Sequence, residues 1–193
     1  MAITCDDPDN LQHAALAIQE LLVAVGDFGD RDGLAETPQR AAKAWMEWTA
    51  GYRQNPAEIL KSFDGGSYDE MVVVRDIPVY STCEHHLAAI FGTATIAYIP
   101  DGQVVGLSKL ARLVDVFARR LQVQERMTVQ IAEALAGSAL SPLGVGVMLR
   151  CRHMCMEARG IRAPGTHTVT TALRGRLKAG EPRAEFLAVA NSS

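Results

Sequence analysis

The sequence predicts an α+β protein: an antiparallel sheet with two consecutive helices packed on it, preceded by a helical region. Two patterns support this fold class. Apolar residues recur at three- and four-residue intervals in the first part of the chain, whereas valine- and isoleucine-rich runs typical of strands follow residue 67. The strand-like runs come in pairs, and two consecutive helix-like segments separate them. We therefore place an N-terminal helical region at residues 1–63 and a second, sheet-containing domain at residues 64–193.

Three helices are expected in the first region. Residues 11–25 carry an apolar stripe at helical spacing and end at a glycine, and residues 37–49 form a second helix with proline in its first turn. Asn55 offers a cap for a short third helix, which has proline and glutamate in its first turn. The run Asp-Gly-Gly-Ser at 64–67 is the clearest linker in the chain.

The second region is expected to alternate strands with helices. Strands are predicted at residues 71–80, 93–99, 145–156 and 166–173. Helices are predicted from Ser108, which would act as the cap, at residues 123–136, and at residues 181–189.

The bulk composition narrows the class of protein. With 193 residues, 48% hydrophobic and 21% charged, the chain has the make-up of a globular protein large enough to bury a core. Its net charge of −3 argues against a general nucleic-acid binder. No run is long and apolar enough to span a membrane, and the N-terminus lacks a secretory core, so we expect a cytoplasmic protein with reduced cysteines. Cys5, near the N-terminus, is expected to take no part in a site.

Cysteine and histidine are concentrated in two short clusters. Cys83 and His86 lie in the first, and His153 and Cys155 lie in the second, together with Cys151. Thiolate and imidazole are the ligands that Zn²⁺ prefers. Three ligands would make a hydrolytic centre, and four would make a structural site.

The spacing of the second cluster leaves the ligand count open. On a strand, residues two apart share a face, so Cys151, His153 and Cys155 are expected to project together. A closed site of Cys83, His86, Cys155 and either Cys151 or His153 is one alternative. In another, Cys151 is a small buried hydrophobe. A nucleophilic Cys–His pair is weaker, because it leaves the second cluster unexplained.

A three-ligand site has direct chemical consequences. Zn²⁺ lowers the pKa of a bound water to about 7, which makes a nucleophile available near neutral pH. His85 and His153, if they are not ligands, would lie beside the metal as proton carriers. This combination suits hydrolysis of a C–N bond.

Basic residues offer a pocket for a polyphosphate. They are Lys109 and Arg112 at a helix start, where Ser108 adds a hydroxyl, Arg159 after the second cluster, and Arg40 and Lys43 on one face of the second helix. Each could instead be a solvated surface group. Glu125 begins another helix, where it could stabilise the positive end of the helix dipole or accept two hydrogen bonds from the amidine edge of guanine.

The motifs together resemble those of the GTP cyclohydrolase I family, of the zinc-dependent type. The matching segments are Ser-Thr-Cys-Glu-His-His at 81–86, Gly-Leu-Ser-Lys at 106–109, Gln-Val-Gln-Glu-Arg at 122–126, His-Met-Cys at 153–155 with Ala-Arg-Gly at 158–160, Thr-Val-Thr-Thr at 168–171, and Glu-Thr-Pro-Gln-Arg at 36–40. The likeness runs from about residue 11 to the end of the chain. Because several spaced motifs occur in the family's order, it is highly specific.

The resemblance implies a tunnelling fold assembled as a toroidal homodecamer, with active sites between subunits. It also implies conversion of GTP and water to formate and 7,8-dihydroneopterin triphosphate, the first step of tetrahydrofolate and pterin biosynthesis.

The same resemblance assigns the site residues. The zinc ligands fall on Cys83, His86 and Cys155, and the catalytic histidines on His85 and His153. The guanine-anchoring carboxylate falls on Glu125, with Gln124 alongside. The triphosphate contacts fall on Ser108, Lys109, Arg112 and Arg159, and on Arg40 and Lys43 from a neighbouring subunit.

Two positions depart from the family's pattern. Cys151 lies where no family ligand is expected, and its binding to the metal would close the site. Glu157 is acidic where some members carry lysine, which could weaken local attraction for phosphate. Two other functions stay open at this point: a non-enzymatic binding module stapled by zinc, and a same-fold enzyme acting on a related purine or pterin.

Overall fold

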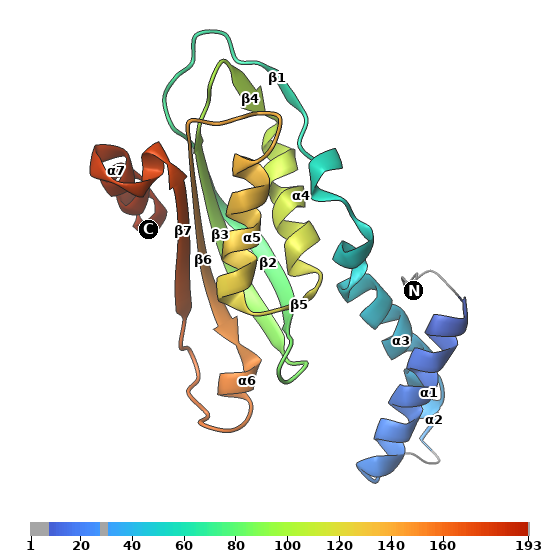
Figure 1. The fold of residues 1–193 in the computed structure, drawn as a ribbon. Coiled ribbons are helices and arrows are strands. Elements are labelled where there is room, and N and C mark those ends of the chain that lie inside the picture. Colours follow the sequence, from blue (N-terminus) through green and yellow to red (C-terminus); the bar gives the residue numbers. More distant parts are fainter. Residues whose placement is uncertain (1–7, 28–30, 193) are drawn as a thin grey trace.

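A computed structural model of the chain describes residues 8–27 and 31–192. The N-terminal region is helical, as predicted. It contains α1 (Pro8–Ala24), α2 (Asp32–Ala35) and α3 (Thr37–Trp48), followed by short 3₁₀ turns at Ala50–Arg53 and Pro56–Glu58. Helices α1 and α3 pack on each other and project away from the sheet (Figure 1), while the C-terminal end of α3 contacts the rest of the molecule through an ion pair between Glu47 and Arg119. Cys5 lies outside the described residues.

The third expected helix is a single 3₁₀ turn. The side chain of Asn55 caps it, since its Oδ1 accepts a hydrogen bond from the Ala57 N–H at 3.1 Å. Beyond this turn, β1 (Ser62–Asp64) pairs with β4 (Gln103–Val105) in a small antiparallel ribbon.

The remaining strands form a five-stranded sheet in the order β5-β2-β3-β6-β7. Its strands are β2 (Val72–Cys83), β3 (Ala89–Ile99), β5 (Leu121–Gln122), β6 (Gly144–His153) and β7 (Thr168–Gly175). The four long strands are antiparallel to their neighbours, and the short β5 runs parallel to the end of β2. The predicted α+β class with an antiparallel sheet is confirmed.

Helices cover both faces of this sheet (Figure 1). On one face lie α4 (Leu107–Ala118) and α5 (Gln124–Ala136), which bury the main core against β2, β3 and β6. On the other lies α7 (Gly180–Asn191), whose Phe186 is fully buried in a second, smaller cluster. The two consecutive helices between the strand pairs were predicted from the sequence, and α7 extends slightly beyond its predicted bounds.

Two local predictions were wrong. Ser108 does not cap α4; Gly106, with extended backbone, is the cap residue, and its carbonyl accepts the Lys109 N–H at 2.7 Å. The strand predicted at 145–156 ends at His153, and the chain turns into the short helix α6 (Met154–Glu157). Alternating apolar residues continue past His153, and that alternation extended the predicted strand too far.

Candidate metal centre and active site

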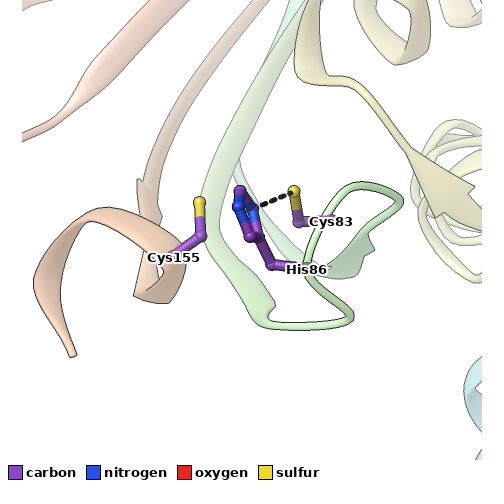
Figure 2. Close-up of side chains that lie close together, drawn as sticks. All are labelled: Cys83, His86 and Cys155. Atoms are coloured by element: carbon purple, nitrogen blue, oxygen red, sulfur yellow. Dashed lines mark hydrogen bonds between the residues drawn. The ribbon is translucent and has the colours of Figure 1, made fainter. Parts of the chain in front are cut away.

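Three of the predicted ligands meet at one end of the sheet. The ligand atoms of Cys83, His86 and Cys155 all lie within 4.8 Å of one another. Cys83 Sγ lies 4.0 Å from His86 Nδ1 (Figure 2). Cys83 is buried, Cys155 is partly buried and His86 is exposed, so the group opens to solvent on one side.

Sheet register brings the two clusters together. Strand β2 ends at Cys83, and a tight turn leads into β3; the turn is closed by a hydrogen bond from the Cys83 N–H to the Ala88 carbonyl at 2.8 Å. In the next ladder, Ile90 of β3 pairs with His153 at the end of β6. The hairpin turn and the beginning of α6 therefore lie side by side at the same edge.

Cys151 belongs to the core. It is fully buried among the residues that β6 turns toward α4 and α5, including Leu149 and Val147. Burial raises the pKa of its thiol to about 12, so the thiol is protonated at neutral pH. Within the described residues, the Cys-His-Cys group does not include Cys151. This placement fits the alternative in which Cys151 acts as a small hydrophobe.

Cys155 reaches the group from α6. The prediction that it shares a strand face with Cys151 and His153 was wrong, because the backbone becomes helical at Met154. The Ala158 N–H donates to the Met154 carbonyl at 2.9 Å and closes this single turn. Burial, and secondarily the neighbouring Cys83 sulfur, raise the pKa of Cys155. Binding of a metal there would therefore displace a proton.

His153 is held by Gln124. Its Nε2 lies 2.7 Å from the Oε1 of Gln124, whose amide nitrogen faces the carbonyls of Thr168 at 3.0 Å and Leu149 at 3.3 Å. Carbonyl oxygens only accept, so the amide orientation is fixed and Nε2 of His153 must donate. In the neutral ring, Nδ1 is then the acceptor.

Burial lowers the pKa of half-buried His153, and the Glu125 charge opposes this shift more weakly. The exposed Glu125 directly follows Gln124, the residue hydrogen-bonded to that ring, in the first turn of α5. Arg159 is also close to the metal group: its Nη1 donates to the carbonyl of Cys155 at 3.4 Å.

His85 lies on the solvent side of the turn. Its ring is exposed, and its Nε2 is 3.9 Å from a carboxylate oxygen of Glu84. His85 and His86 meet edge to face, with ring centroids 6.2 Å apart. A titratable ring thus stands next to the group that could hold a metal.

Glu157 forms an ion pair with Arg152 of β6. Arg152 grips the Glu157 carboxylate with two nitrogens, and one of these contacts, from Nε to Oε1, measures 2.8 Å. The pairing holds the pKa of Glu157 below its usual range. Its negative charge is therefore balanced locally by Arg152.

The residues predicted to bind phosphate do not all join this group within one chain. The Val105 N–H, just before α4, donates to the Tyr98 hydroxyl at 3.0 Å. Tyr98 is on the same strand as Ile90, which lies beside the metal group, and at about 3.3 Å per residue the two are roughly 26 Å apart. The beginning of α4 carries Ser108, Lys109 and Arg112 and so lies at the opposite end of the sheet (Figure 1).

Arg40 and Lys43 also lie away from the Cys-His-Cys group. They are exposed on α3, in the helical region that stands off from the sheet (Figure 1). Arg40 is bound by residues just before its helix, with Nη1 2.9 Å from Oε2 of Glu36, the cap residue of α3, and Nη2 2.8 Å from the carbonyl of Gly33 in α2.

Sequence reasoning singled out Gln124 as a neighbour of substrate, but the structure shows it fully buried and bonded to His153. Glu84 and Arg126 were not singled out, although each lies inside a quoted motif and they form an ion pair beside the group. Opposite charges in two separate motifs were the signal available.

A Cys-His-Cys group with two flanking histidines and a carboxylate at a helix start is characteristic of a metal-dependent enzyme. The comparison with known proteins is more specific. The sequence profile of the family GTP cyclohydrolase I matches residues 14–191, and the chain belongs to that family.

Relatives of known family match this chain in sequence over most of their length. GTP cyclohydrolase 1 of Janthinobacterium sp. (strain Marseille) is 61% identical over 175 residues, covering 89% of this chain and 88% of that one. The protein of the same name from Nitrosospira multiformis is 61% identical over 177 residues, covering 90% and 92%. That from Streptomyces griseus is 55% identical over 181 residues, covering 92% and 89%. In the part of the chain that the structure describes, no helix has the length and apolar character needed to cross a membrane.

Proposed function

We propose that this enzyme is a zinc-dependent GTP cyclohydrolase I that converts GTP and water to formate and 7,8-dihydroneopterin triphosphate. The observation that carries the proposal is the convergence of Cys83, His86 and Cys155 within 4.8 Å, beside His153 and His85. Family membership supports GTP as the substrate. This would be the entry step of tetrahydrofolate and pterin biosynthesis.

The donor set fits zinc. Two thiolates and one imidazole are typical zinc ligands, and three protein ligands are the number used by catalytic sites. The core position of Cys151 supports this count. When bound, the metal would supply a Lewis acid that makes water nucleophilic near neutral pH.

The protein's own groups would recognise the purine and move protons. Glu125, exposed at the start of α5, would accept two hydrogen bonds from the amidine edge of guanine. His153 would carry a proton to and from N7 of the imidazole ring as water adds at C8 and the C–N bond breaks. Gln124 would hold the His153 ring in place by fixing Nε2 as the donor. His85, exposed at the rim, would serve as the second proton carrier.

The triphosphate would be bound between copies of the chain. Arg159 lies at the metal group. In contrast, Ser108, Lys109 and Arg112 lie in the first turns of α4, which begins at the opposite end of the sheet, and Arg40 and Lys43 lie on α3. One triphosphate cannot reach all of these groups in a single chain. If all of them serve GTP, the site must be completed by neighbouring subunits. Sites shared between copies are consistent with the tunnelling fold and the homodecamer that the family resemblance implies, and we propose both for this chain.

We also propose that residues 1–63 act as a helical arm in that assembly, that residues 64–193 form the catalytic domain, and that the enzyme works in the cytoplasm. The exposed apolar residues on α1, among them Leu21 and Val23, are consistent with an arm that packs against other copies.

The direct test is to incubate zinc-loaded protein with GTP and measure formate together with a fluorescent pterin after oxidation. Both products should appear in equal amounts, and neither should form after chelation. Absence of both from zinc-loaded protein would contradict the proposed reaction.

Chelation also separates the enzyme from a zinc-stapled binding module. Of the three ligands only Cys83 belongs to the buried core, which extends along the whole sheet between it and its helices, so circular dichroism should show the fold retained when activity is lost. Global unfolding on chelation would favour the stapled module.

Substrate recognition is tested by Glu125→Ala. The loss of two charge-assisted hydrogen bonds should weaken GTP binding by at least about tenfold while zinc stays bound. Glu133→Ala, at the far end of the same helix, is the matched control and should bind GTP like the wild type. Unchanged GTP affinity in Glu125→Ala would remove that residue from the site, and tight binding of another purine or pterin would point to a different substrate.

A further inference from the structure

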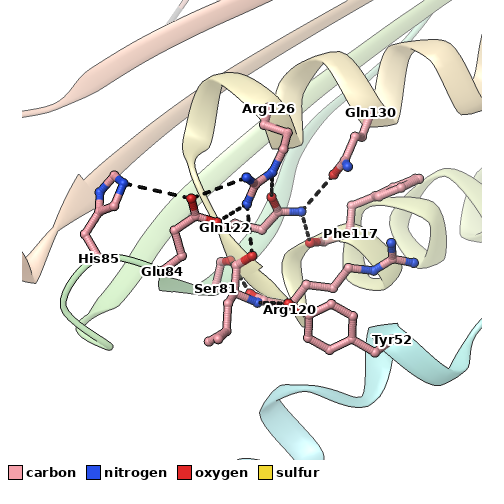
Figure 3. Close-up of polar contacts among 10 residues, drawn as sticks. Tyr52, Ser81, Glu84, His85, Phe117, Arg120, Gln122, Arg126 and Gln130 are labelled. Atoms are coloured by element: carbon pink, nitrogen blue, oxygen red, sulfur yellow. Dashed lines mark hydrogen bonds and ion pairs between the residues drawn. The ribbon is translucent and has the colours of Figure 1, made fainter. Parts of the chain in front are cut away.

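The guanidinium of Arg126 lies between Gln122 and the turn that carries Glu84 and His85 (Figure 3). Both of its terminal nitrogens contact the carboxylate of Glu84; one of these bonds, Nη1 to Oε1, measures 3.3 Å. The same group also donates to the Leu121 carbonyl at 3.2 Å and, from Nε, to Gln122 Oε1 at 3.2 Å. A single side chain on α5 therefore contacts both strand β5 and the turn between β2 and β3, which carries Cys83 and His86 and is called the metal-binding turn below.

Gln122 makes this junction rigid. Its side chain is almost completely buried, and its Nε2 donates to the Phe117 carbonyl of α4 and to Gln130 Oε1 of α5, each at 2.9 Å. The Gln122 carbonyl accepts the Glu84 N–H at 3.1 Å. Arg126 is thus supported by a buried amide whose own hydrogen bonds are made inside the fold (Figure 3).

The two ends of this network carry different parts of the candidate site. Glu84 lies between Cys83 and His85 in the turn, and its carboxylate is also 3.9 Å from the His85 ring. Arg126 directly follows Gln124 and Glu125, the residues at the start of α5 that face His153 and the proposed guanine site. The Arg126–Glu84 pair is the side-chain link between the two.

We propose that Arg126 is a positioning residue that, through Glu84, fixes the metal-binding turn relative to the substrate-recognising start of α5. This role rests on the proposed function, because it assigns the two ends of the pair to metal and purine. Arg126 touches neither of them. Its contribution is to hold Cys83, His85 and His86 at the distance from Glu125 that the reaction needs.

An ordinary surface ion pair would contribute little, typically 1 kcal/mol or less. Three features separate this pair from that case: the guanidinium grips both carboxylate oxygens, it is bonded to a buried amide, and it joins segments distant in sequence. A planar fork of this kind cannot be reproduced by lysine, which offers a single point charge.

The matched control is an ion pair that involves the same helix. Arg174 of β7 pairs with Glu133 near the other end of α5, with Nε to Oε1 at 2.7 Å, and so joins α5 to the sheet away from the site. Arg174→Gln removes an ion pair of the same kind, and its loss reports what such a pair contributes to stability alone.

The experiment compares Arg126→Gln and Arg126→Lys with Arg174→Gln. Zinc affinity is measured by competition with a chelator, turnover by formate release, and ligand geometry by the visible absorption of the protein loaded with Co²⁺. Arg126→Gln should weaken zinc binding and lower kcat by about tenfold each, the usual effect of losing a group that supports a metal ligand. Arg126→Lys should recover less than half of that loss, and the cobalt spectrum should change in both. Arg174→Gln should match the wild type within about twofold.

Glu84→Gln completes the test and covers the case in which Arg126→Gln does not fold. If the two residues act as one unit, Glu84→Gln combined with Arg126→Lys should be no worse than the more severe single variant. The proposal is overturned if the Arg126 variants, or Glu84→Gln in their place, match Arg174→Gln in zinc affinity, cobalt spectrum and kcat. The zinc and cobalt measurements need no turnover, so they test the positioning role even if the wild-type protein releases no formate from GTP, a result that would count against the proposed function alone.

Discussion

The imidazole of His153 donates from Nε2 to the side-chain oxygen of Gln124 at 2.7 Å, and this bond joins the end of β6 to the first turn of α5. Because the Gln124 nitrogen is held by carbonyls of the sheet, the amide cannot rotate to offer its nitrogen instead. The ring is therefore fixed with Nδ1 as its acceptor.

Gln124→Ala should release the ring. We expect kcat to fall by about tenfold or more while zinc stays bound, because the ligand set is untouched. The fold should lose about 1–3 kcal/mol, since the buried carbonyl of Leu149 and the half-buried carbonyl of Thr168 lose a partner. Thr128→Val, which also loses buried hydrogen bonds on α5, is the stability control. A Gln124→Ala enzyme that turns over at the rate of the Thr128→Val enzyme would show that the bond has no part in catalysis.

Cys151 and Cys155 should respond differently to removal of sulfur. Cys151→Ala should bind one zinc per chain as the wild type does and cost about 1 kcal/mol of stability, because it leaves a small cavity in the core. Cys155→Ala should lose zinc at concentrations that saturate the wild type, because it removes a ligand. Zinc content after dialysis checks both. Loss of zinc from Cys151→Ala would mean that Cys151 is a ligand after all.

The Arg152–Glu157 pair should make stability depend on pH. Its pairing lowers the folded-state pKa of Glu157, so the stabilisation is present above the ordinary glutamate pKa of about 4.3 and is lost as the pH falls through the folded value. Metal-free Glu157→Gln should therefore melt below the wild type at pH 7, and the two melting temperatures should converge below about pH 4. A difference that stays constant from pH 7 to pH 3 would contradict this role.

Gly92 lets β3 and β6 approach closely. A Cβ at this position would lie 2.1 Å from the Arg150 carbonyl oxygen, a main-chain atom that cannot rotate away. Gly92→Ala should cost more than about 3 kcal/mol or prevent folding, measured by urea denaturation. Gly33→Ala is the control, because a Cβ there meets nothing and α2 should be unaffected or slightly stabilised. Equal stability of the two variants would show that the ladder can relax around a methyl group.

Local sequence pattern was sufficient to predict the N-terminal helical region, the antiparallel sheet and its two consecutive helices, because helical and strand periodicities are visible over a few residues. The ligand types were predictable for a similar reason: the spacing of cysteine and histidine is itself a chemical signal. Those predictions needed no knowledge of which strands are neighbours.

The end of β6 was not predictable in this way. Alternation continued past His153, and only the turn into α6 separates Cys155 from the strand face that Cys151 shares with Leu149. Likewise, the spacing between Glu84 and Arg126 gave no sign that they meet, because that contact depends on β5 running parallel to β2. Which side chains share a site is decided by strand register and helix packing, which join residues far apart in the chain and therefore leave no local pattern.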